Sequence, residues 1–106
     1  MLTKENITAM SNAAIVQELG RQYRTYRLRA RLTQQEVATH AGVSLPTLRA
    51  FEQGSANNIT MSNFLSLLRT IGQLGTMADV LPDIPISPYL LSEYNGQLPK
   101  RIRHGK

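Results

Sequence analysis

Apolar residues recur at steps of three and four along two long segments of the chain, which is the period of an amphipathic α-helix. The first segment runs from about Ala13 to Ala30, and the second from Thr60, a predicted N-cap, to Gly72. We expect these residues to face a core: Ile15, Val16, Leu19, Tyr23 and Tyr26, then Met61, Phe64, Leu65, Leu68 and Ile71. Gly20 interrupts the first helix at a cost of about 1 kcal/mol, so we expect a neighbouring helix to pack closely there.

Two shorter helices are predicted between these segments. Thr33 and Glu36 have the spacing of a capping box, and Gly42 is placed to end this helix in the left-handed conformation. Ser44 then caps a second helix, with Pro46 in its first turn, and Gly54 ends it. Together with a short helix after Gly75, these segments predict an all-α, five-helix domain over residues 13–81.

A turn this short forces the two inner helices to cross steeply, so the second one projects from the body and can enter a major groove. The two inner helices and their turn resemble the helix-turn-helix of Cro and lambda-type (XRE) repressors at matching spacing. The residues that carry this resemblance are Gln34, Glu36, Ala38, Gly42, Val43, Ser44, Leu48, Glu52 and Gly54. This resemblance implies a lambda-repressor-like fold that binds double-stranded DNA. The alternative is a pair of packed helices that serves as a protein-interaction module.

The exposed stripe of the second inner helix is predicted to read DNA. Leu48 and Phe51 point inward, so the outward residues are Leu45, Pro46, Arg49 and Gln53, with Ala50 at the edge. Arg49 alone has the bidentate geometry for a guanine edge, while Ser44 and Thr47 suit phosphates or bases. Leu45 and Pro46 depart from the family pattern, which places polar residues there; alternatively they pack on the preceding helix or face another protein.

The resemblance assigns further roles outside this stripe. Gln34 and the loop Gly54–Ile59 are expected at the DNA; this loop carries no Lys or Arg, so Asn57 and Asn58 are its candidate contacts. In the family, an Arg late in the first helix pairs with a Glu near the end of the recognition helix, which implies an Arg27–Glu52 ion pair. The alternative is two unrelated solvated charges.

The run ITMSNFLSLLRTIGQLGTMADVLPD resembles the corresponding segment of HipB-like antitoxins, and this match covers roughly Leu19 to Leu91. The resemblance implies a homodimer that represses its own operon from a palindromic operator and that partners a HipA-type kinase toxin. A stand-alone transcription factor is the alternative. We expect dimer contacts from apolar residues around the short helix after Gly75, unless they only close the core: Leu74, Met77, Val80 and Leu81.

The two ends of the chain differ in composition. Residues 1–12 show no sustained period, and we expect a loose arm or a short helical turn. Residues 82–106 form a Pro-containing extension, with a short helix at about 88–94 and a mobile basic tail. Its apolar residues are expected to bind a partner subunit or a toxin: Ile84, Ile86, Tyr89, Leu90, Leu91 and Tyr94.

Charge and composition agree with a DNA-binding protein of the bacterial cytoplasm, associated with the nucleoid. The net charge is +5, with no cysteine, no basic-then-apolar secretory leader and no apolar run near the ~20 residues that span a bilayer. His40 and His104 lack metal-ligand spacing, and no glycine-rich phosphate loop occurs. We therefore expect no enzyme activity, cofactor, metal site, membrane partner or small-molecule ligand, and we expect His40 to be exposed.

Overall fold

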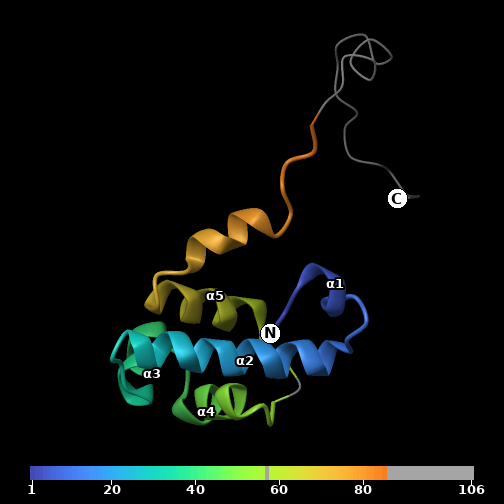
Figure 1. The fold of residues 1–106 in the computed structure, drawn as a ribbon. Helices are drawn as coiled ribbons and strands as arrows, with labels where there is room; N and C mark the ends of the chain where they lie inside the picture. The colour runs from blue at the N-terminus through green and yellow to red at the C-terminus, as the bar shows by residue number, and fades with distance from the viewer. Residues whose placement is uncertain (57, 86–106) are drawn as a thin grey trace, which may run out of the picture.

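The computed structural model describes residues 1–56 and 58–85. Within these residues the chain is all-α, as predicted, with no strand: it forms α1 (Lys4–Ile7), α2 (Asn12–Arg29), α3 (Gln34–Ala41), α4 (Leu45–Gln53), α5 (Met61–Thr70) and a 3-10 helix, η1 (Leu74–Asp79) (Figure 1). The predicted helix at 88–94 and the basic tail lie outside the described residues. No helix in the described ranges has the length and apolar character needed to cross a membrane.

Helix α2 is the central element of the fold. In Figure 1 it lies between α4 and α5, with α1 near its first end and α3 near its last. It begins after Ser11, whose side chain accepts a hydrogen bond from the Ala14 amide, so the helix starts one residue before the predicted Ala13. After α2 the chain turns through Arg31, the one non-glycine residue with positive φ (60°) in the described ranges.

The core gathers side chains from α2, α3, α4 and α5. Its fully buried members are Val37, Leu48, Phe51 and Leu67, and Tyr23, Ala38 and Val43 join them. The Phe51 ring contacts two other aromatic rings, with centroids 6.0 Å from Tyr23 and 6.1 Å from Phe64. Phe51 is therefore the point where α2, α4 and α5 meet.

Two core predictions were wrong. Met61 is 63% exposed, whereas Leu67, which was not predicted to be buried, is completely inaccessible. Leu68, which was predicted to be buried, is buried beside Leu67, so the buried face of α5 is rotated away from Met61 at the start of the helix. Tyr26 was also assigned to the core and is 48% exposed, since it lies at the rim of the α2–α5 interface.

Gly20 allows α2 and α4 to approach each other closely, which confirms the expectation at this position. A Cβ atom at residue 20 would lie 1.8 Å from the backbone oxygen of Phe51, so any side chain would push the helices apart. The inner face of α4 thus lies directly against the backbone of α2. This contact determines how α4 sits on the domain.

The segment before the domain agrees with the prediction of a short helical turn, whereas the last helix differs in detail. Residues 1–12 contain the short helix α1, in which Thr3 and Asn6 form a capping box. The helix predicted after Gly75 begins at Leu74 and is a 3-10 helix without a side-chain cap. The two apolar residues that follow this helix do not close the core, because Val80 is 57% and Leu81 86% exposed.

Candidate nucleic-acid interface

Helix α3 is held at both ends by the residues that the sequence singled out. The Thr33 amide donates to Glu36 Oε1 at 2.8 Å, and the Glu36 amide donates to Thr33 Oγ1 at 3.0 Å. At the other end Gly42 has φ 68°, and the Val43 amide donates to the Ala38 carbonyl at 3.1 Å. These bonds satisfy helix-end groups that would otherwise lack partners, and they set the direction of the turn into α4.

Helix α4 starts with an equally well-defined cap. Ser44 Oγ accepts from the Thr47 amide at 3.2 Å and donates to Thr47 Oγ1 at 2.7 Å. Because Ser44 donates its only hydroxyl hydrogen, Thr47 keeps its own hydrogen for an external acceptor such as a phosphate oxygen. Gly54, with φ 77°, ends the helix. The Gln17 side chain donates to the Gly54 carbonyl at 3.2 Å and so ties this end of α4 to α2.

The two faces of α4 have opposite character. Leu48, Phe51 and Glu52 are buried, whereas Pro46, Arg49 and Gln53 are exposed. Arg49 forms no salt bridge with any residue in the described part of the chain. Its guanidinium is therefore available to a base edge or a phosphate.

Leu45 is not part of the exposed stripe to which it was assigned. It is half-buried and packs against the core, because its position in the first turn of α4 brings its side chain over the apolar residues beneath the turn. Leu45 thus packs inward against the core cluster, while the more specific alternative, packing on the preceding helix, stays a prediction. Pro46 remains exposed.

An ion pair between α2 and α4 holds the C-terminal end of α4 in place. Arg27 donates through Nε to Glu52 Oε2 at 2.7 Å and through Nη2 to Glu52 Oε1 at 2.8 Å, as the resemblance implied. The two side chains are only 7% and 1% exposed. A third bond, from Arg27 Nη1 to the Leu32 carbonyl at 2.8 Å, attaches the turn before α3 to the same group.

The electrostatics of the buried site follow from this pair. Hydrogen bonding to the Glu52 carboxylate raises the pKa of Arg27 above its ordinary value, so the guanidinium stays charged at any physiological pH. Burial, with a smaller contribution from Glu52, raises the pKa of the Tyr23 hydroxyl. That hydroxyl donates to the Leu67 carbonyl at 3.0 Å and links α2 to α5.

Gln34 has a role that the sequence did not reveal. It was expected at the DNA, but its Nε2 donates to Glu52 Oε1 at 3.1 Å, and the side chain is only half-exposed. Gln34, at the start of α3, therefore braces the same carboxylate as Arg27. No signal in the sequence separates this bracing role from a DNA contact, because the partner lies 18 residues away.

A shallow hollow of about 630 Å³ lies beside this ion pair and includes Arg24, Gln34 and Gln53. Arg24 is exposed, and it extends the polar surface of α4 onto α2. Arg21, in contrast, pairs with Glu18 at 2.9 Å. Among the predicted loop contacts Asn58 is exposed, and Asn57 lies outside the described residues.

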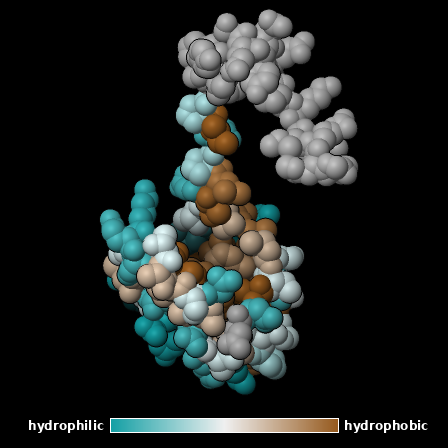
Figure 2. Space-filling model, turned by 90° about the vertical axis from the view of Figure 1, so that its right-hand side faces the viewer, coloured by the Kyte–Doolittle hydropathy of each residue, from teal (hydrophilic) through white to brown (hydrophobic). Residues whose placement is uncertain are grey.

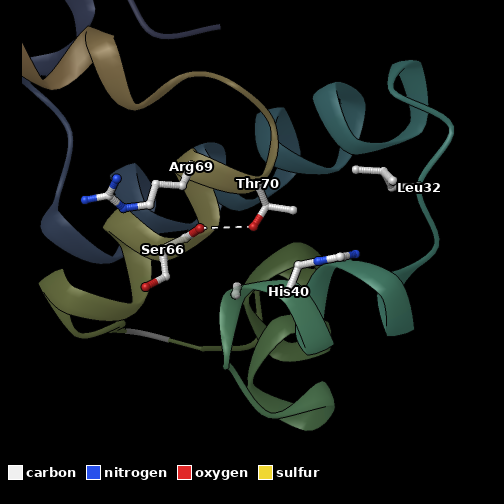
Figure 3. A pocket seen from close by; sticks show the side chains of 6 residues that line it. Leu32, His40, Ser66, Arg69 and Thr70 are labelled. Atoms are coloured by element: carbon white, nitrogen blue, oxygen red, sulfur yellow. Dashed lines mark hydrogen bonds between the residues drawn. The ribbon is translucent and has the colours of Figure 1, made fainter.

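A second hollow, of about 440 Å³, lies where α3 and α5 meet and includes His40, Ser66, Arg69 and Thr70. Thr70 Oγ1 donates to the Ser66 carbonyl at 3.1 Å, while the side chains of His40 and Arg69 point in different directions (Figure 3). His40 is exposed, as predicted. These groups do not converge on one point, and within the described ranges no cluster of three or more His, Cys, Asp or Glu side chains could hold a metal ion.

A second helix with an exposed polar face, joined to the helix before it by a short glycine turn and a hydroxyl cap, is the arrangement of a DNA-binding helix-turn-helix module. The chain belongs to the helix-turn-helix domain family, whose model matches residues 18–81. The matched range contains α3, α4, α5, η1 and most of α2. Neither the curated proteins nor the solved structures yielded a match to this chain.

Proposed function

We propose that this protein is a sequence-specific DNA-binding transcription regulator that inserts α4 into a major groove. The observation that carries the proposal is the division of α4 into a buried face, fixed by Glu52 and Phe51, and an exposed face that presents Arg49. A helix anchored this firmly can place one guanidinium reproducibly against a guanine edge, where a bidentate contact is worth about 1–3 kcal/mol of discrimination.

Phosphate contacts surround this central contact in the proposal. Thr47 has a hydroxyl hydrogen to donate, and Arg24 and Gln53 lie on the same polar surface. Such contacts fix the register on the duplex without reading bases. Asn58, and Asn57 as predicted from the sequence, would add uncharged contacts, which make little difference to salt dependence.

Repression as a homodimer on a palindromic operator is the form of regulation that we infer. One small module touches few base pairs, and a two-fold dimer doubles the contact at half-sites about 34 Å apart. Repression follows when such an operator overlaps the protein's own promoter, as the resemblance to HipB-like proteins implied.

The test is selection of binding sites from a randomised duplex pool by the full chain, followed by titration of the selected and scrambled duplexes at several salt concentrations. We expect an inverted repeat, bound at least about 10³-fold more tightly than scrambled DNA. Equal affinity for all duplexes, lost at moderate salt, would instead indicate a protein-interaction module with only non-specific attraction to DNA.

An antitoxin role beside a HipA-like kinase is the second candidate that we propose. Its support is the HipB-like run up to Asp83 together with the exposed apolar side chains Leu81 and Ile84, which are 86% and 85% accessible. Affinity capture from the native cells tests it. A co-purifying kinase together with DNA of the gene's own promoter supports this role, whereas DNA alone supports a free-standing regulator.

A further inference from the structure

An apolar groove lies between α2 and α5, on a surface to which α3 and α4 contribute no residue. It has a volume of about 520 Å³, and its lining includes Tyr26, Met61, Phe64, Leu68, Met77 and Val80. Tyr26, Met61 and Val80 at its rim are 48%, 63% and 57% exposed. Figure 2 shows hydrophobic residues gathered around a hollow on one face and continuing into the start of the extension. An open apolar surface of this kind is typical of an interaction site.

The chain itself carries a segment with the pattern that such a groove binds. Ser87 and Pro88 are suited to the cap and first turn of a helix, and the apolar residues that follow keep helical spacing with Ile86: Tyr89, Leu90 and Tyr94. Leu90 and Tyr94, four residues apart, lie on one face of such a helix with Tyr89 at its edge, and Ile86 precedes the cap; amphipathic helices bind apolar grooves through a face of this kind.

The described start of the extension favours the groove of a second copy over the chain's own. Val80 lines the groove, but from there the chain leads away from the domain through Pro82 to Pro85 (Figure 1). The residue before each proline is biased towards extended conformations, so Leu81 and Ile84 favour the extended course that the chain takes after Val80. Both residues are highly exposed, as they would be in an arm that reaches another subunit.

We infer that residues 84–94 of each subunit occupy the α2–α5 groove of a second copy of this chain. The inference rests on the homodimer of the proposed function and names its contact surface. A reciprocal exchange is two-fold symmetric, and two tyrosines of about 150–250 Å² each per arm, with the aliphatic anchors, reach the ~1,200 Å² of a stable interface. It leaves α4 of both subunits free for DNA.

Dimer dissociation of the full chain, measured by sedimentation, tests both sides of the contact. Met61→Glu places a carboxylate at the groove rim. Residue 61 is the first position of α5, where a negative charge interacts favourably with the helix dipole, so the substitution should not destabilise the helix. Leu90→Glu alters the arm. Each should raise the dimer dissociation constant at least about tenfold, because the carboxylate would be buried without a partner.

The matched controls are Ser62→Glu, the exposed neighbour in the first turn of α5, and Ser92→Glu, on the opposite face of the predicted arm helix. Both should stay within about twofold of the unmodified protein. Unchanged dimerisation in Met61→Glu and Leu90→Glu would overturn the inference. A second outcome would also overturn it: Leu90→Glu keeps the dimer intact but loses a co-purifying protein. The arm would then bind that protein instead of a second copy of the chain.

Exchange between subunits is tested separately. The chain has no cysteine, so Ser92→Cys accepts a single spin label. Spin-labelled chains at natural nitrogen abundance are mixed with ¹⁵N-labelled chains that carry no spin label. Broadening of the Tyr26 and Met77 amides in the ¹⁵N chains supports exchange, while broadening only when both labels share a chain would overturn it. DNA selection distinguishes this inference from the proposed function: Met61 and Leu90 lie outside α4, so variants that lose the dimer should still select a half-site, whereas failure of the unmodified chain to select any sequence would overturn the proposed function.

Discussion

The segment from Thr33 to Gly54 and the segment from Leu74 to Pro85 have opposite structural character. In the first, hydroxyl caps start both helices, left-handed glycines end them, and Val37, Leu48 and Phe51 are buried. In the second, the 3-10 helix has no side-chain cap, and Val80, Leu81 and Ile84 are 57–86% exposed. The first segment buries its apolar side chains within the domain, whereas the second leaves apolar side chains exposed to solvent.

The largest expected effect comes from removing the ion pair of the first segment. Glu52→Ala should lower the free energy of unfolding by about 3–5 kcal/mol, because Arg27 is left buried without its carboxylate partner. Thermal melting measures it. The double variant Arg27→Met/Glu52→Leu is the control and should recover most of the loss, since two apolar side chains can fill the same space. Unchanged melting of Glu52→Ala would show that the pair does not hold α4.

The close approach of α2 and α4 gives the next effect. Gly20→Ala should destabilise the fold by about 1–3 kcal/mol or more, because the added methyl group overlaps the Phe51 carbonyl. Gly75→Ala in the second segment is the matched control, since a Cβ there meets nothing within 4 Å. Chemical denaturation of both variants measures the difference. Equal losses would mean that the two segments are equally tightly packed.

Arg49→Ala separates binding from stability. It should reduce discrimination at one base position by about 1–3 kcal/mol and leave the melting temperature unchanged, because Arg49 is exposed. Titration of single-base operator variants measures it, and Gln53→Ala provides a comparison on the same face. A uniform weakening on all sequences, with a shallower salt slope, would reassign Arg49 to a phosphate.

Ionisation of the Tyr23 hydroxyl should make the stability of the fold depend on pH in alkaline solution. Its pKa is raised in the fold by burial, so the folded state keeps a proton that the unfolded chain loses near pH 10. Stability from this group is therefore present below about pH 10 and is lost as the pH rises towards the raised folded value. Tyr23→Phe should cost about 1 kcal/mol at neutral pH and flatten the alkaline loss.

Melting between pH 8 and pH 11 checks this prediction, with Tyr26→Phe as the control because Tyr26 is half-exposed. Parallel alkaline curves for the unmodified protein and Tyr23→Phe would contradict it.

The smallest effect on stability should follow removal of residues 82–106. Since Leu81 and Ile84 pack on nothing in the domain, the unfolding free energy at dilute, monomeric concentration should change by no more than about 0.5 kcal/mol. The sedimentation coefficient should instead report a lost dimer. A truncated chain that fails to fold would show that the second segment belongs to the core after all.

Local rules predicted the helix boundaries well because each cap is a contact between near neighbours. Thr33 with Glu36, Ser44 with Thr47 and Thr60 with Asn63 each span three residues, and each formed as the sequence indicated. The Arg27–Glu52 pair spans 25 residues, and it was expected only through resemblance to a family. The roles of individual DNA-facing residues remain predictions.

Predictions failed where two arrangements satisfied the same local rule. Helical period allowed either Met61 or Leu67 in the core, and hydrophobicity favoured neither. Leu45 and Pro46 adjoin in the first turn of α4, yet Leu45 packs inward and Pro46 is exposed. Gln34 donates to Glu52, and its contact with DNA stays a prediction.

The sequence by itself determined that the domain is helical, where its inner helices begin and end, and that Arg49 lies on the outward face of one of them. Helix capping, glycine conformation and the apolar period each depend on residues close together in the chain, so they can be predicted from the sequence. Only the tertiary structure decided that Leu67 rather than Met61 is buried in α5, that Gln34 joins Arg27 on one carboxylate, and that an apolar groove stays open beside η1. These depend on the relative rotation of helices, which is set by packing between residues far apart in the chain.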